Sequence, residues 1–249
     1  MGNDSKKIPK KDNETKTDDT KNNTLINIEK YLQNSSKPLT EGNSYLAKKI
    51  EDEYAKIETN IQQICLGKNS DDEEKENEIL GKYLFELKQI SEKAFIFADK
   101  LKDSFFEEFK SKNKEFSNLR KHDDPGCILE FSAWCKNSLK DEKKFLEEMC
   151  DKYKDKEYND EDLEILKQLT GIYLKCFLCS QKIEFKKCKN NCEFNPKEMY
   201  DMAEIRDNKR KKVNFYVLPG LYTNELFFRN GKIHVFTYLP DTYYLKLND

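Results

Sequence analysis

The amino-acid sequence predicts a predominantly α-helical α+β fold, in which an antiparallel helical bundle is followed by a small C-terminal antiparallel β-meander. Apolar residues recur at steps of three and four over much of residues 25–175, which is the period of amphipathic helices. From Val213 onward they alternate with other residues, which is the period of strands. Two close cysteine pairs stand between these parts, and the predicted organisation is a disordered tail (1–24), a helical bundle (25–175), and a cysteine-rich connector, helix and meander packed on the bundle (176–249).

The composition excludes some broad classes of function. The chain has 249 residues, which is long enough to bury a core without covalent help. Its 45 Lys+Arg against 47 Asp+Glu give a net charge of −2, which argues against binding of nucleic acid over the whole surface. The eight glycines form neither a G-x-G-x-x-G nor a G-x-x-x-x-G-K motif, so we expect no nucleotide site built on a glycine loop.

The N-terminal tail is informative about the cellular compartment of the protein. Met1 and Ile8 are the only large apolar residues in 1–24, so this stretch is expected to be disordered. Gly2 stands at the position of N-myristoylation, but the serine of that motif is at position 5 instead of 6, which favours a plain solvated tail. A membrane partner is expected only if Gly2 is acylated. The tail has no apolar signal segment, and no apolar run reaches the roughly 18 residues of a membrane span, so the predicted location is cytoplasmic, with nuclear as the alternative.

The bundle is predicted to contain five helices before the cysteines. A short one covers 25–33, and an amphipathic one covers 43–66, with Gly67 placed to end it. Ser70 and Glu73 form a capping box for a helix that reaches about residue 112. After a loop at 113–123, Pro125 begins a helix over 125–155. Asn159 or Asp160 caps the last helix, which runs directly into Cys176.

The C-terminal part is predicted to combine one more helix with strands. Asn195 and Pro196 begin a helix that carries Met199 and Met202 and closes in a basic run. Strands follow around 213–217, on both sides of Asn230-Gly231, and at 243–247. Asn-Gly is a strong signal for a type I′ hairpin, and a two-residue turn there would pair Leu226 with Val235.

The four clustered cysteines are Cys176, Cys179, Cys188 and Cys192, spaced C-x2-C and C-x3-C. Four thiolates in two short pairs are typical of a structural zinc site, which leaves no open position for catalysis. If the two pairs lay on two helices, nested disulfides could instead join Cys176 with Cys192 and Cys179 with Cys188. Four reduced thiols with no joint role are the third interpretation. Zinc is favoured because nothing in the sequence indicates an oxidising compartment. The other cysteines, at 65, 127, 135 and 150, are expected in the core.

No catalytic constellation is recognisable. The two histidines, His122 and His234, lack the sequence context of a nucleophile and are expected to be structural, so we expect the protein not to be an enzyme. Aromatic residues at 227, 236 and 238 either pack under the helices or form a partner-binding patch. The resulting hypothesis is a non-enzymatic interaction or scaffold protein with a protein partner and a structural zinc or disulfide staple.

The alternative is a nucleic-acid- or ribosome-associated protein. It would use a basic run beside the cysteines, which could contact phosphates or serve as a nuclear localisation signal. The simpler interpretation of this run is the charged last turn of a helix, where cations are favoured by the helix dipole. Its basic residues are Arg206, Lys209, Arg210, Lys211 and Lys212.

Overall fold

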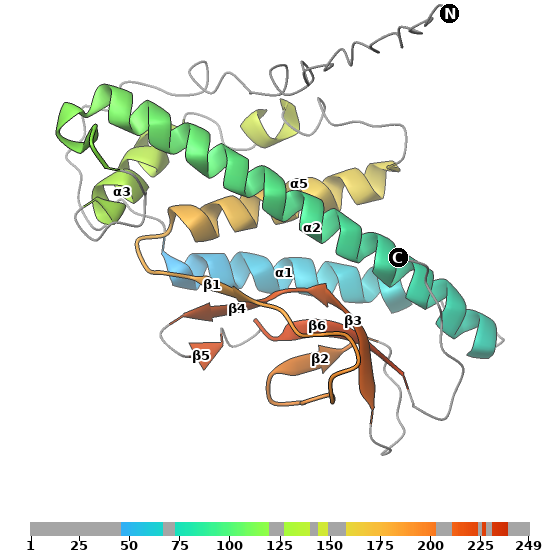
Figure 1. Ribbon diagram of the computed structural model, residues 1–249. Helices are drawn as coiled ribbons and strands as arrows, with labels where there is room; N and C mark the ends of the chain where they lie inside the picture. Colours follow the sequence, from blue (N-terminus) through green and yellow to red (C-terminus); the bar gives the residue numbers. More distant parts are fainter. Residues whose placement is uncertain are drawn as a thin grey trace, which may run out of the picture.

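The predicted α+β class is confirmed. The structure is a computed structural model that describes residues 46–66, 73–119, 127–139, 144–148, 158–202, 211–223, 226–227 and 231–238. Within these, helices occupy the N-terminal part and strands the C-terminal part (Figure 1). The helices are α1 (Ala47–Leu66), α2 (Glu73–Lys112), the 3-10 helix η4 (Lys114–Phe116), α3 (Ile128–Ser138) and α5 (Asp160–Leu178), with a further helical turn at 144–148. The strands are β1 (Glu184–Lys186), β2 (Met199–Asp201), β3 (Lys212–Leu218), β4 (Gly220–Thr223), β5 (Leu226–Phe227) and β6 (Ile233–Tyr238).

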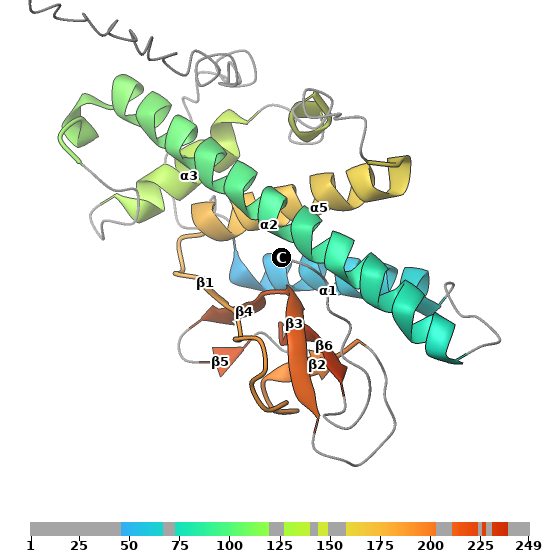
Figure 2. The same cartoon turned by 45° about the vertical axis from the view of Figure 1, so that its right-hand side comes forward.

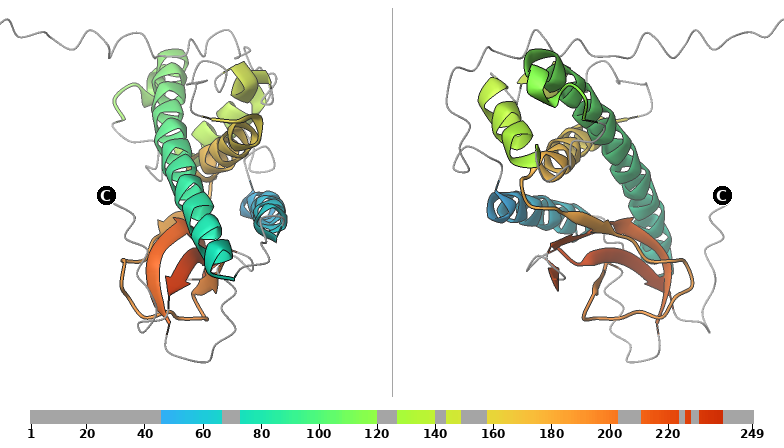
Figure 3. Two further views of the ribbon diagram at one scale, coloured as in Figure 1. Left: turned by 90° about the vertical axis from the view of Figure 1, so that its right-hand side faces the viewer. Right: turned by 60° about the vertical axis from the view of Figure 1, so that its left-hand side comes forward.

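Helix α2 is the longest helix described, and the other parts pack along it. Near its N-terminal end, Phe85 meets Phe215 of β3 edge to face, with ring centroids 5.6 Å apart. Midway, the hydroxyls of Ser91 and Tyr173 of α5 are hydrogen-bonded at 2.8 Å. Near its C-terminal end, Phe109 contacts Trp134 of α3, also at 5.6 Å. Strand β3 therefore packs against the N-terminal half of α2, whereas α3 packs near its C-terminal end (Figures 2 and 3).

The helical predictions that follow apolar periodicity are largely confirmed. Helix α1 buries a face of residues spaced three and four apart, among them Ile50, Tyr54 and Ile61. Helix α2 covers Glu73–Lys112 and so ends at the predicted residue 112, whereas Ser70 of the predicted capping box lies outside the described residues. Asn159 caps α5 as predicted, since its side chain accepts a hydrogen bond from the backbone N–H of Asp162 at 2.9 Å. Each large apolar side chain buried in this way contributes roughly 1.5–3 kcal/mol.

Two of the predicted helices are wrong. In place of one helix over 125–155, α3 ends at Ser138, because Leu139 adopts an extended conformation (φ −72°, ψ 108°). The helical turn at 144–148 then places Phe145 against Phe105 of α2, with ring centroids 5.7 Å apart. Packing of two separate apolar segments against α2 thus prevails over a single continuous helix.

The helix predicted from Asn195 is replaced by a turn and strand β2. The carbonyl of Asn195 accepts from the N–H of Glu198 and of Met199, at 3.1 and 2.8 Å, which makes one turn. The chain then pairs in parallel with β6, and the N–H of Ile233 donates to the carbonyl of Glu198 at 3.0 Å. Backbone pairing with the edge of β6 therefore determines the conformation of this segment, although the spacing of Met199 and Met202 is that of a helix.

The strands form two three-stranded sheets instead of one meander, with the orders β1-β4-β5 and β2-β6-β3. The predicted pairing of Leu226 with Val235 is wrong, because Leu226 pairs with Thr223, and Val235 pairs with Tyr216 and Asp201. Strand β6 has β3 on one edge and β2 on the other, so β5 joins the neighbouring sheet. A two-residue turn motif predicts pairing only between the strands directly beside it. Strand β6 pairs instead with β3, which is longer than β5 and rich in apolar residues.

A single apolar cluster contains residues of all the named α-helices and of both sheets, including Phe215, Leu221 and Phe236. The predicted tail 1–24, Gly2, the helix at 25–33 and the strand at 243–247 lie outside the described residues, and the domain boundaries remain a prediction. Among the helices described, none combines the length and apolar character needed to cross a bilayer.

Candidate functional site

The four clustered cysteines come as two pairs in different surroundings. Cys176 and Cys179, at the end of α5, are 3% and 1% exposed and belong to the main core cluster. Cys188 and Cys192 are half-buried and pack against a second apolar cluster formed by the β2-β6-β3 sheet. Burial, together with the neighbouring Cys192, raises the pKa of the Cys188 thiol to about 12. The structure thus brings together the members within each pair.

This arrangement bears on the two predicted links between the cysteine pairs, a four-thiolate zinc site and nested disulfides. Among the described residues, no three His, Cys, Asp or Glu side chains are grouped so as to hold a metal ion. Cys188 is an unbridged thiol whose neighbour is Cys192, which is not the partner that nested disulfides would require. A four-thiolate zinc site would need the two pairs to come together, and it stays a prediction.

Cys188 and Cys192 lie on a turn and not, as the spacing suggested, one helical turn apart. Asn191 has a positive φ of 63°, the only such value among the described residues other than glycine. Its N–H donates to the carbonyl of Val213 at 2.7 Å, and the N–H of Val213 donates to the carbonyl of Cys192 at 2.9 Å. The turn is therefore held against β3. Asn190-Asn191 was the available signal, because asparagine tolerates the left-handed conformation.

The described part of the basic run does not form an open patch. The Nζ of Lys211 lies 2.9 Å from Oδ2 of Asp201, with side chains 14% and 9% exposed. The same carboxylate oxygen accepts from the hydroxyl of Thr237 at 2.8 Å. Lys212 is half-buried on β3. Arg206, Lys209 and Arg210 lie outside the described residues, so the nucleic-acid alternative stays a prediction.

His234 of β6 is buried against Glu58 of α1, whereas His122 lies outside the described residues. The Nε2 of His234 is 3.5 Å from Oε1 of the buried Glu58, and its ring lies against Tyr200. Burial lowers the pKa of His234 to about 4 and raises that of Glu58 to about 8. The pair is enclosed in the fold, and the structural role expected for His234 stays a prediction.

The predicted aromatic face of the last hairpin is partly internal. Phe236 is buried in the main core cluster, where its ring lies 5.4 Å from that of Phe215. Tyr238 is half-buried, and its hydroxyl donates to Oδ1 of Asn191 at 3.1 Å. Nothing is described of the Phe227 side chain. Of the two alternatives for this face, packing inside the fold therefore holds for Phe236.

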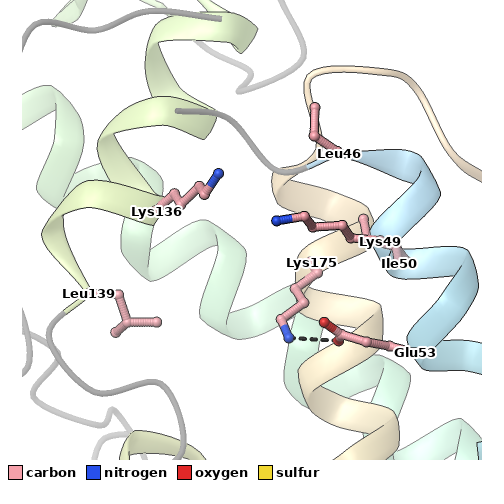
Figure 4. Close-up of a pocket in the computed structure, with 7 residues that line it drawn as sticks. All are labelled: Leu46, Lys49, Ile50, Glu53, Lys136, Leu139 and Lys175. Carbon is pink, nitrogen blue, oxygen red and sulfur yellow. Dashed lines mark hydrogen bonds and ion pairs between the residues drawn. The ribbon is translucent and has the colours of Figure 1, made fainter. Parts of the chain in front are cut away.

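The feature that sequence reasoning missed is a pocket of about 200 Å³ between α1, α3 and α5 (Figure 4). Three lysines from three helices line it, one each from α1, α3 and α5. The remaining lining residues are a glutamate and three aliphatic side chains. The full lining is Leu46, Lys49, Ile50, Glu53, Lys136, Leu139 and Lys175.

Lysines outnumber acidic residues in the lining of the pocket. The amino groups of Lys49 and Lys136 point toward each other across it (Figure 4). The pKa of Lys136 is lowered, first by burial and second by the charge of Lys49. On the other wall, Lys175 Nζ lies 2.7 Å from Glu53 Oε2. The lining thus holds three lysines and one glutamate.

No local signal could have shown this pocket. Its lysines are widely separated along a chain with 45 Lys+Arg, and none belongs to a motif. Only the packing of α3 and α5 beside α1 brings them together. The chain matches no model of a protein family, no curated protein and no solved structure, so its function must be inferred from the geometry of the molecule itself.

Proposed function

We propose that this is a non-enzymatic interaction protein that binds an acidic segment of a partner protein at the pocket between α1, α3 and α5. The observation that carries the proposal is the convergence of Lys49, Lys136 and Lys175 on one small pocket with aliphatic walls. Charge-assisted hydrogen bonds from lysine to a carboxylate are stronger than neutral ones. A carboxylate that enters between Lys49 and Lys136 would therefore be bound and would also offset their repulsion.

The size and lining of the pocket favour a side chain as the bound group. About 200 Å³ is below the roughly 300–1,000 Å³ typical of sites for whole small molecules or cofactors. A glutamate, an aspartate or a C-terminal carboxylate is of suitable size. Leu46 is 44% exposed at the pocket and would contact an apolar residue next to the acidic one. The favoured ligand is thus an acidic peptide segment with an apolar neighbour.

A protein partner is favoured over a nucleic acid by the same lining. The volume of about 200 Å³ suits one carboxylate side chain, whereas a nucleic-acid backbone carries a phosphate at every nucleotide and needs many cations. The net charge of −2 provides no general attraction for such a backbone. Of the basic run that supports the nucleic-acid alternative, Lys211 is already paired with Asp201. Binding of RNA at this pocket is therefore not expected, and its detection would favour the nucleic-acid alternative.

The test uses the full chain, fluorescently labelled, on an array of immobilised peptides. Each peptide carries one aspartate or glutamate beside leucine or phenylalanine, and neutral peptides with asparagine or glutamine serve as the comparison. The variant is Lys49→Ala/Lys136→Ala. The matched control is Lys56→Ala, which removes an exposed lysine of α1 that does not line the pocket. Circular dichroism verifies that all three proteins are folded.

We expect acidic peptides to bind wild type and Lys56→Ala alike. The double variant should bind at least about tenfold more weakly, because two charge-assisted contacts are lost. Binding should also weaken with salt, since the site is partly open to solvent. Equal binding by the double variant, or no preference for acidic over neutral peptides, would contradict the proposal. Binding of an RNA homopolymer that survives the double substitution would favour the alternative.

A further inference from the structure

The turn at 188–192 has features that neither the pocket nor the fold requires. Cys188 and Cys192 both pack against the apolar cluster of the β2-β6-β3 sheet and are half-buried, so that solvent reaches them. The turn is held in place by the two hydrogen bonds that join Asn191 and Cys192 to Val213 of β3. The backbone therefore holds both cysteines on one turn beside the same sheet.

A third sulfur atom lies in the same apolar cluster. Met199 of β2 is buried there, and Cys188 and Cys192 pack against this cluster. Its Sδ accepts the backbone N–H of Asn195 at 3.5 Å, which holds the side chain in place. Two thiols and a thioether, with aromatic and aliphatic neighbours, form a soft, sulfur-rich environment. Such ligands select soft cations over hard, oxygen-preferring ones.

We propose that Cys188 and Cys192 bind one copper(I) ion. Each thiol gives up its proton to solvent and each sulfur forms one bond to the metal, so that Cu(I) and two thiols yield a bis-thiolate complex and two protons, with no change of oxidation state. The complex carries one negative charge. Lys187 and Lys189 flank Cys188 in sequence and are exposed, and they supply positive charge near it.

Copper(I) fits this pair better than zinc does. Structural zinc takes four ligands in a tetrahedron, and among the described residues no third His, Cys, Asp or Glu joins the two cysteines. Copper(I) is softer and accepts as few as two thiolates. Cys176 and Cys179 do not offer an equivalent site, because both are buried in the main core. The proposal therefore concerns the half-exposed pair alone.

The experiment measures how well the full chain competes for copper(I). Protein reduced with a phosphine is titrated under nitrogen into the coloured copper(I) complex of bathocuproine disulfonate, and the loss of colour is recorded. Wild type should withdraw a single equivalent of copper, and Cys188→Ser and Cys192→Ser should each lose this ability. The matched control is Cys176→Ala, which changes a cysteine of the buried pair and should still withdraw one equivalent.

A second measurement uses wild type alone and so does not depend on the folding of variants. The protein is treated with iodoacetamide with and without copper(I), digested, and analysed by mass spectrometry. Copper should protect Cys188 and Cys192 from alkylation. Absence of protection at these two cysteines, or no withdrawal of copper by wild type, would overturn the proposal. Loss of binding in a folded Cys176→Ala protein would also overturn it and would indicate a site shared by all four cysteines.

Discussion

At the scale of single residues, burial changes the chemistry of groups that the sequence presents as ordinary. Glu58 lies on the inner face of α1 between Tyr54 and Ile61, in a position that helical spacing assigns to the core. Its Oε1 is 3.5 Å from the Nε2 of His234, and burial raises the pKa of Glu58 to about 8 and lowers that of His234 to about 4. An ionisable pair enclosed in this way makes the stability of the fold depend on pH.

The direction of this dependence follows from proton binding in the two states. Between the ordinary pKa of glutamate, 4.5, and about 8, native Glu58 keeps a proton that the unfolded chain has lost, so stability falls as pH rises. Between 6.5 and about 4, unfolded His234 takes up a proton that the native state excludes, so stability falls as pH falls. The two effects offset each other between 4.5 and 6.5, and above 6.5 that of Glu58 acts alone.

We therefore predict that Glu58→Gln removes a loss of stability on the alkaline side. From pH 6.5 to above 8, wild type should lose about 2 kcal/mol more than the variant, at 1.36 kcal/mol per pKa unit. Urea unfolding at pH 6.5 and pH 8.5 measures this difference. Asp52→Asn, which changes an exposed carboxylate on the same helix, should behave like wild type. Equal pH slopes for wild type and Glu58→Gln would contradict the prediction.

At the scale of elements, the sequence was a good guide wherever one apolar face spans a whole helix. Helices α1, α2 and α5 have long periodic stripes, α2 ends at the predicted residue, and Asn159 marks where α5 begins. The errors arose where a short segment had a choice of partner. The chain at 199–201 pairs with β6 instead of forming a helix, and β5 pairs with β4 instead of β6. Such choices depend on residues that are distant in the sequence, and the local spacing of apolar residues contains no information about them.

The N-cap of α5 gives a prediction at this scale. Asn159→Ala should destabilise the protein by about 1 kcal/mol, because the backbone N–H of Asp162 loses its acceptor at the start of the helix. Asn159→Ser should retain most of the stability, since serine is also a good N-cap residue. Thermal unfolding followed by circular dichroism compares the two variants with wild type. A serine variant as unstable as the alanine variant would show that the cap is not the cause.

The two candidate sites differ in how many elements build them, and this difference explains which of them could be predicted from the sequence. The cysteine pairs are local in sequence, so they could be singled out, although the turn at Asn191 and the separation of the pairs could not. The lysine pocket needs α1, α3 and α5 at once, and none of its lysines is unusual in a lysine-rich chain. The cysteines could be predicted as a candidate site because they are close together in the sequence, whereas the lysines of the pocket are far apart in it.

At the scale of the whole molecule, α2 links the sheets to α3. Phe215 of β3 and Trp134 of α3 lie near opposite ends of this helix, yet both belong to the same apolar cluster. A continuous core of this kind favours cooperative unfolding, whereas the division at residues 175 and 176 predicted from the sequence would allow the two parts to unfold separately. Trp134 is the only tryptophan and is buried, so its fluorescence reports on the end of the molecule far from the sheets.

Phe215→Ala distinguishes these two possibilities. Removal of this buried ring should cost about 3 kcal/mol, through lost burial and the cavity that remains. In a single cooperative unit the loss reaches the other end, so the urea midpoint measured by Trp134 fluorescence should fall together with that measured by circular dichroism. The control is Ile96→Ala, which truncates an exposed side chain of α2 and should leave both midpoints nearly unchanged. If the fluorescence midpoint stayed at the wild-type value while the circular dichroism midpoint fell, the helical part would unfold independently of the sheets. The boundary at residues 175 and 176 would then separate two folding units, in spite of the apolar cluster that they share.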